Sequence, residues 1–253
     1  MVPLRPLSVG ELLDAAIRTY RERFKALVSA VAVPIIPVVV LQTLIAWSIE
    51  PEAANPLKAP DASATADLSQ LWLQLAGSLV NVVAVLIGTA LATAACFRVL
   101  SAAYVGGEVG WRESLAFART RLASVIGLTL LTGLGTALGF VLCIVPGVLA
   151  FTWWSVATPA LLMEGLGAVD AMSRSTRLAK QRFWPVLGAM LLSSLLAGIF
   201  QGMVSAPLIG LLFTDVNGIV LYVVEGIVNL IALILVTPFT AAFTLALYVD
   251  LRV

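Results

Sequence analysis

The chain has 253 residues, of which 60% are hydrophobic and 11% are charged. Soluble proteins average about 45 to 50% apolar and about 25% charged residues, so this composition excludes an ordinary water-soluble domain and predicts a single integral membrane domain. The net charge of +1 gives no reason to expect nucleic-acid binding, and the absence of histidine removes the commonest general base and most zinc-site patterns. We therefore expect a non-enzymatic protein with no cofactor, no metal site and no nucleic-acid partner.

The first predicted element is an amphipathic helix within residues 1–25. Ser8 and Glu11 have the spacing of a capping box, in which the serine hydroxyl and the glutamate carboxylate each accept a hydrogen bond from a free amide at the helix start. Arg18, Arg21 and Lys25 lie off the apolar face, so the helix suits a membrane surface. The apolar face consists of Leu13, Ile17, Tyr20 and Phe24.

Six apolar runs follow, and we assign them as transmembrane helices that cross about 30 Å of hydrocarbon at about 1.5 Å per residue. The first run is preceded by a polar, amphipathic segment and is longer than a signal-peptide core, so we expect it to stay in the mature protein. Residues 50–67, rich in proline, alanine and acids, are predicted to form an irregular extracytoplasmic loop. The predicted spans are residues 26–49, 68–95, 122–145, 148–163, 184–212 and 219–247.

Turn chemistry at residues 144–147 and 214–218 predicts tight helical hairpins, whereas the longer segments 96–121 and 164–183 join one hairpin to the next. With six spans, both termini and these two segments lie on one side of the membrane. They hold all of the 15 Lys and Arg residues except Lys58, so the positive-inside rule predicts that this side is cytoplasmic. Cys96 and Cys143 are then expected to be free thiols near opposite membrane faces.

A junction of cations, a phenylalanine and an apolar run occurs twice, as RTYRERFKALV at residues 18–28 and as RLAKQRFWPVL at residues 177–187. A third, shorter copy is WRESLAFARTRLASV, which begins at Trp111. The sequence therefore predicts an all-α, six-span membrane bundle made of three pseudo-repeated hairpins, each preceded by an amphipathic cytoplasmic helix.

The cations of the two matched junctions are candidates for contact with anionic lipid headgroups, because each Lys or Arg near the inner leaflet contributes about 1 kcal/mol. Phe24 and Phe183 are expected to enter the acyl boundary beside them. The alternative is that these cations only orient the helix ends and bind no specific lipid. The candidates are Arg18, Arg21, Arg23, Arg177, Lys180 and Arg182.

Three polar residues within the spans, Glu225, Asn229 and Asn81, are candidates for lining a cavity or a transport path. Glu225 is the one acid expected inside a span, and Asn229 follows it at i+4 on the same helical face. As alternatives, Glu225 reaches the interface or pairs with a neighbouring helix, and Asn81 holds helices together. The spans also carry glycine pairs that predict close helix packing, within the bundle or between copies: Gly135 with Gly139, and Gly198 with Gly202.

Three stretches carry a resemblance to a known family: RPLSVGELLDAAIRTYRERF near the start, PGVLAFTWWSVATPALLMEGLGAVDAMSRSTRLAKQRFWPVLG in the middle, and LYVDLRV at the end. The chain resembles the bacterial membrane-protein family named after the membrane domain of glycerophosphoryl diester phosphodiesterase, and its composition is similar to that of actinobacterial proteins. The resemblance implies a place in the bacterial cytoplasmic membrane. We expect no hydrolase barrel, which needs roughly 200 or more residues of soluble α/β pattern, so no catalytic residue carries over.

Two functions are compatible with these features. The first is a scaffold or accessory subunit that organises partners in lipid or envelope processes, with membrane lipids and a second copy or another membrane protein as its partners. The second is a transporter or permease-type subunit for a small molecule or lipid, with Glu225, Asn229 and Asn81 around its path. An intramembrane enzyme would need convergent acid, base or metal ligands, which the sequence does not show.

Overall fold

The structure is a computed structural model that describes residues 8–49, 68–107, 109–212 and 218–252. The regular secondary structure of these residues is entirely helical, which confirms the predicted all-α fold. The predicted loop 50–67 and residues 214–217 of the last predicted turn lie outside the described residues. Six described stretches are long and apolar enough to cross a membrane, as in a multi-pass membrane protein: Phe24–Ser48, Leu71–Tyr104, Trp111–Leu142, Ile144–Glu164, Phe183–Leu208 and Val220–Asp250.

The described residues form short and long helices in chain order. Their bounds are α1 (Val9–Glu22), α2 (Phe24–Ile49), α3 (Leu68–Tyr104), α4 (Trp111–Leu142), α5 (Ile144–Trp153), α6 (Ala157–Glu164), α7 (Ala168–Gln181), α8 (Phe183–Leu212) and α9 (Gly218–Asp250). The predicted capping box opens α1. The Glu11 amide donates to the Ser8 hydroxyl at 3.3 Å, and the Ser8 amide donates to the Glu11 carboxylate at 2.8 Å.

The duplicated junction has the same arrangement of helices in both copies. α1 is capped by Arg23 and α7 by Arg182, and in each copy the next residue begins a long apolar helix. The amide four residues beyond each arginine donates to the arginine carbonyl, from Leu27 to Arg23 at 3.0 Å and from Val186 to Arg182 at 3.1 Å. The chain therefore bends from a short helix directly into a long one, as the repeated sequence predicts.

The middle unit departs from the prediction. α4 is continuous, so the third copy of the amphipathic segment, from Trp111 to Arg121, is the first part of a long helix and not a separate one. The tight hairpin predicted between these two spans is present, but its position is wrong, because the chain reverses at Cys143, whose backbone is extended, and α5 has already begun at Ile144. Pro146 is accommodated in α5 because the amides of a helix's first turn have no intrahelical partner to lose.

Two span boundaries also differ from those predicted. α3 continues to Tyr104, well past residue 95, and the predicted span 148–163 is divided by a turn that follows Trp153. Hydropathy identifies only the apolar part of a helix. The backbone hydrogen bonds of the helix continue beyond that part as long as the backbone geometry allows.

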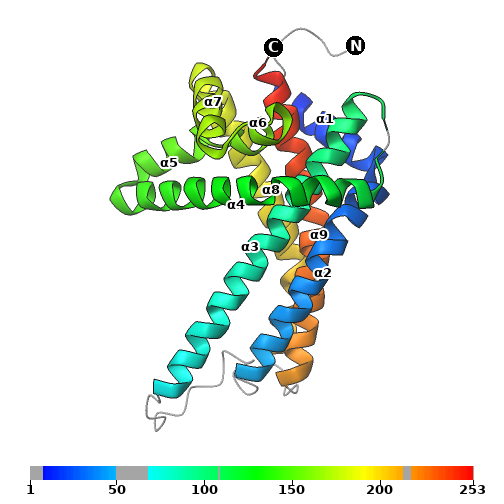
Figure 1. The fold of residues 1–253 in the computed structure, drawn as a ribbon, viewed down its shortest axis with the longest axis vertical. Coiled ribbons are helices and arrows are strands. Elements are labelled where there is room, and N and C mark those ends of the chain that lie inside the picture. Colours follow the sequence, from blue (N-terminus) through cyan, green and yellow to red (C-terminus); the bar gives the residue numbers. More distant parts are fainter. Residues whose placement is uncertain (1–7, 50–67, 108, 213–217, 253) are drawn as a thin grey trace.

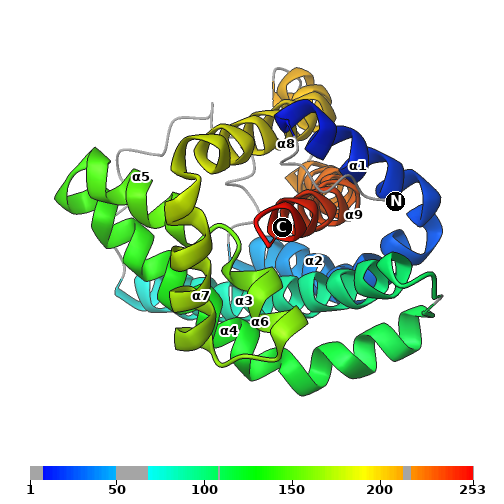
Figure 2. The same cartoon turned by 90° about the horizontal axis from the view of Figure 1, so that it is seen from above.

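Figure 1 shows α2, α3, α8 and α9 running along the length of the molecule, whereas the hairpin of α4 and α5 lies across them near one end. Seen from above in Figure 2, α9 is viewed almost end-on, but α1, α4 and α7 are viewed lengthwise. We call this end, where α1, α4, α6, α7 and the last turn of α9 meet, the cationic end, because the described Lys and Arg residues come from elements gathered there. The middle hairpin is therefore not aligned with the other long helices.

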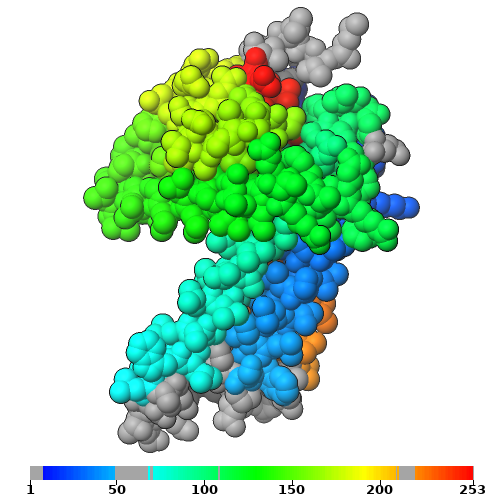
Figure 3. Space-filling model, in the orientation of Figure 1, coloured from blue at the N-terminus to red at the C-terminus, as the bar shows by residue number. Residues whose placement is uncertain are grey.

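The packed core lies at the cationic end and depends on small residues of α3. Ala92, Ala94, Ala95 and Cys96 are fully buried, which lets neighbouring helices approach α3 closely. Towards its other end α3 leaves this core, and Figure 3 shows its N-terminal half projecting from the crosswise layer beside α2. Trp72 in that half is 71% exposed. An apolar helix exposed in this way requires lipid or another helix as its surroundings.

Candidate functional site

A polar cavity of about 260 Å³ lies between α2, α3 and α9, in the half of the molecule away from the cationic end. Glu225 and Asn229 line it from α9, and Asn81 lines it from α3. The structure thus brings together the three intramembrane residues that the sequence singled out. Asn81 on α3 is far in sequence from Glu225 and Asn229 on α9, so only the fold makes it their neighbour.

Close helix packing fixes the shape of this cavity. A Cβ atom built on Gly226 would lie 2.6 Å from the Thr43 hydroxyl oxygen, so α9 approaches α2 at a point where a larger residue would not fit. The Thr43 hydroxyl donates to the Val39 carbonyl at 3.0 Å, within its own helix. Glu225 precedes this contact directly and Asn229 follows it by three residues, so both line the cavity beside it.

Gln42 and Tyr222 also line the cavity, and sequence analysis did not identify them. The sequence nevertheless contained a feature that could have identified each of them. Gln42 is a lone amide in an apolar run, the same feature that identified Asn81, and Tyr222 lies three residues before Glu225 and therefore on the same side of α9.

The cavity can accept hydrogen bonds and hold a small polar or cationic group. The Asn81 side-chain oxygen is buried and has no hydrogen-bond partner among the described residues, so an acceptor there is unsatisfied. Glu225 supplies a second acceptor, and two amide side chains, Gln42 and Asn229, supply both donors and acceptors. Among the described residues, no group of three or more His, Cys, Asp and Glu side chains could hold a metal ion.

A second polar cluster, at the cationic end, is centred on the Glu164 carboxylate. The Tyr248 hydroxyl and the Arg174 guanidinium donate to the same carboxylate oxygen, the latter at 3.1 Å, and Arg252 lies 4.0 Å from it. Nearby, Arg182 forms an ion pair with the buried Asp250 at 3.1 Å. These contacts join α6 and α7 to the end of α9.

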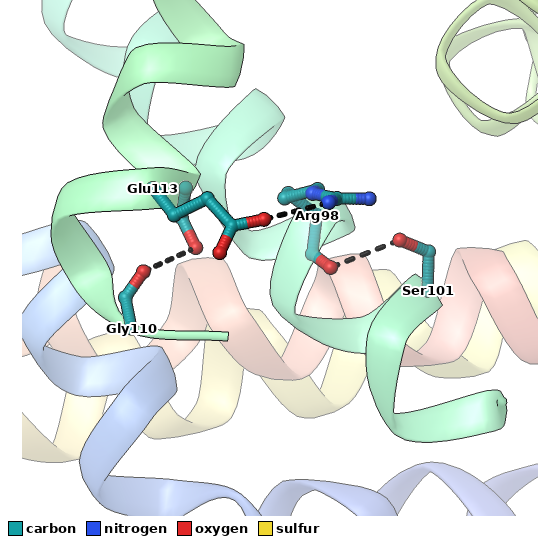
Figure 4. Close-up of polar contacts among 5 residues, drawn as sticks. Arg98, Ser101, Gly110 and Glu113 are labelled. Carbon is teal, nitrogen blue, oxygen red and sulfur yellow. Dashed lines mark hydrogen bonds and ion pairs between the residues drawn. The ribbon is translucent and has the colours of Figure 1, made fainter. Parts of the chain in front are cut away.

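Side-chain contacts also connect the two sides of the turn between α3 and α4. Figure 4 shows the Arg98 guanidinium donating to the Glu113 carboxylate across this turn, at 2.7 Å. The Ser101 hydroxyl donates to the Arg98 carbonyl at 2.9 Å, and the Arg98 guanidinium also lies over the Phe117 ring, 5.7 Å from its centroid. The first turn of α4 is thus held against the last turns of α3.

The predicted lipid-contact cations are used differently in the two copies of the junction. In the second copy Arg182 is bound to Asp250, and the Lys180 ammonium lies 4.7 Å from the centroid of the Trp153 ring. Arg177 is exposed and lines a cavity of about 400 Å³ beside Arg174. This copy therefore serves largely to attach α7 to its neighbours.

In the first copy, Arg18 pairs with Glu22 at 3.0 Å on the exposed side of α1. Arg21 and Arg23 instead line a cavity of about 630 Å³ between the start of α2 and the α3–α4 turn. Tyr20 lies beside them, and its burial raises the pKa of its hydroxyl, an effect to which Cys96 adds. Two predicted cations therefore border an open space in the first copy, whereas only Arg177 does so in the second.

Comparison with protein-family models, with curated proteins and with solved structures gave no match.

Proposed function

We propose that the chain is a non-enzymatic accessory protein of the bacterial cytoplasmic membrane, which organises other membrane proteins through its apolar helices. The three quoted stretches support its membership of the family named after the membrane domain of glycerophosphoryl diester phosphodiesterase. The observation that carries the proposal is the N-terminal half of α3, which leaves the packed core and exposes large apolar side chains over much of its surface.

The N-terminal half of α3 is widely exposed. Leu71, Trp72, Leu73 and Leu75 are all exposed, and at about 100° per residue these four positions cover a little more than half of the circumference of the helix. The remaining face, which includes Asn81, lies against α2 and the polar cavity. Free helical surface of this kind favours association with a second set of helices, driven by packing and by release of lipid.

Site-specific photocrosslinking in native membranes tests this proposal. A photoreactive residue at Leu79, on the free half of α3, is expected to give adducts of discrete mass with a partner protein or a second copy. The matched control is Ile199 in α8, which is also apolar and exposed but lies on a helix packed against α9. Adducts with lipid alone at both positions would contradict the proposal.

The polar cavity favours a second candidate, a transporter or permease-type subunit. An unsatisfied acceptor on Asn81 and a carboxylate on Glu225 are costly in hydrocarbon, and such groups commonly mark a substrate or ion path. In proteoliposomes, transport would appear as cargo flux that is lost in Glu225→Gln and retained in Glu22→Gln, which removes an acid from the exposed face of α1. Flux lost only in Glu225→Gln would replace the accessory role with transport.

A further inference from the structure

An apolar groove of about 550 Å³ lies beneath α1, between this helix and the long helices α8 and α9. α1 packs on α9 through the buried Leu12 and Ala16 but makes few contacts with α8. Figure 2 shows the three helices around this region, with α1 running beside α9 and the start of α1 close to α8. The groove walls are formed by Leu13, Ile17, Leu196, Phe200, Leu235 and Phe239.

The apolar face predicted for α1 is the one that lines this groove. Leu13, Ile17, Tyr20 and Phe24 all border it, and the first three span about 10 Å of α1 at about 1.5 Å per residue. Ile17 and Phe24 remain 39% and 41% exposed, so the helix does not fill the space with its own side chains. The groove is therefore a long apolar channel that lies parallel to α1.

Cations gather at one end of the groove. Arg21 and Phe24 border both the groove and the neighbouring 630 Å³ cavity, which Arg23 and Lys25 also line. Arg21 and Lys25 form no ion pair with any residue in the described part of the chain. Glu22 lines the same cavity, but its carboxylate is paired with Arg18. The balance of charge here is positive.

The ring of Phe24 marks the boundary between the two spaces. It packs edge-to-face against Tyr20, with the ring centroids 5.5 Å apart and the planes at 83°. An apolar channel that ends at a cluster of cations matches a molecule with an acyl chain at one end and an anionic phosphate at the other.

We propose that this groove binds one anionic phospholipid, with its phosphate at Arg21 and Lys25 and an acyl chain between α1, α8 and α9. The guanidinium of Arg21 can give two parallel hydrogen bonds to the phosphate, and Lys25 adds a second charge. The lipid would complete the packing of α1 on α8, which the protein leaves open. This site does not depend on the proposed accessory role.

Lipid exchange with the full-length protein in a mild neutral detergent tests the proposal. Phosphatidylglycerol and phosphatidylcholine of the same chain length are added separately, and bound lipid is counted by native mass spectrometry. We expect phosphatidylglycerol to be retained about tenfold more strongly than phosphatidylcholine by the unmodified protein. Arg21→Gln should abolish this preference, whereas Arg119→Gln, which makes the same change in charge at an exposed position of α4 away from the groove, should keep it.

A second pair of variants tests the acyl channel. Ala197→Trp places a large side chain in the groove and should remove retention of both lipids, and Ile17→Gln, at an exposed position, is the substitute if the tryptophan variant does not fold. Equal effects of Arg21→Gln and Arg119→Gln would overturn the proposal. So would unchanged phospholipid retention when the groove is filled, or competition by inorganic phosphate alone at the concentration of the lipid.

Discussion

Glu164 shows how one residue can hold several elements together at the cationic end. Its carboxylate accepts hydrogen bonds from Tyr248 and Arg174 and lies near Arg252, so α6, α7 and the end of α9 share a single acceptor. The side chain is only 20% exposed, which limits the water available to replace a lost partner. Partly buried pairs of this kind contribute more than exposed pairs, because an unpaired guanidinium would remain in their place.

Glu164→Gln is therefore expected to lower the free energy of unfolding by about 1 to 3 kcal/mol, since it removes the charge that both arginines face. Thermal unfolding in detergent would measure this loss. Glu22→Gln is the matched control, because the Arg18–Glu22 pair is exposed on both sides and such pairs contribute about 0 to 1 kcal/mol. Equal midpoints for the two variants would show that Glu164 does not hold these helices.

Gly139 has a different role from Glu164, since it allows α4 and α5 to touch. A Cβ atom built there would lie 3.0 Å from both the Cα and the nitrogen of Gly147, and backbone atoms cannot move aside as a flexible side chain can. Gly139→Val should therefore destabilise the protein by about 1 to 3 kcal/mol. Gly133→Val in the same helix has open space at the corresponding position and is the control. If thermal unfolding showed a similar loss of stability in both variants, the cause would be the presence of valine in a helix and not the contact at Gly139.

At the scale of elements, local signals in the sequence were sufficient for the surface helices and insufficient for the middle hairpin. The capping box at Ser8 and the duplicated junction at Arg23 and Arg182 are determined by neighbouring residues, and the structure confirms them. The crosswise direction of α4 and α5 accompanies packing of α4 on α3 and of both helices on α7, which no local pattern encodes. Apolar length gives the number of candidate spans, but the direction of a helix follows from contacts that are distant in sequence.

The same limit applies to the polar cavity. Glu225 and Asn229 could be paired from the sequence because they are four residues apart on one helix, and Asn81 was recognised as a polar residue in a span. Their meeting in a single cavity could not be predicted, because it depends on how α3 and α9 are placed around α2. Gln42 shares that dependence, so its part in the cavity becomes visible only in the fold.

The crosswise direction of α4 and α5 leads to a prediction for the native thiols. If the hairpin lies across the other helices in the membrane as it does in Figure 1, Cys143 at its turn does not reach the outer face. A membrane-impermeant thiol reagent should then leave Cys143 unmodified in intact cells. Labelling after denaturation, which also exposes the buried Cys96, shows that both thiols are present. Reaction of Cys143 from outside would show instead that the hairpin crosses the membrane.

At the scale of the whole molecule, the described cations lie on elements that meet at one end, and the ion pairs of Glu164, Asp250 and Glu113 connect those elements. The orientation of such a protein is set by this asymmetry, because cationic segments are retained on the cytoplasmic side during insertion. The middle hairpin does not alter this argument. Whether it spans the membrane or lies along one face, its two ends return to the same side.

The asymmetry predicts that both termini are cytoplasmic. Green fluorescent protein fused after Val253 should be fluorescent and alkaline phosphatase at the same position inactive, because the first matures in the cytoplasm and the second requires export. Phosphatase inserted within residues 50–67, between α2 and α3, should be active, since one long helix separates this segment from the cationic end. Replacing Arg21, Arg23 and Lys25 by glutamine should reduce the difference in phosphatase activity between the insertion within residues 50–67 and the fusion after Val253. The reason is that charges next to the first long helix carry much of the orientation signal. An active phosphatase at the C-terminus of the unmodified chain would reverse the predicted orientation. The groove beneath α1 would then not lie at the cytoplasmic leaflet.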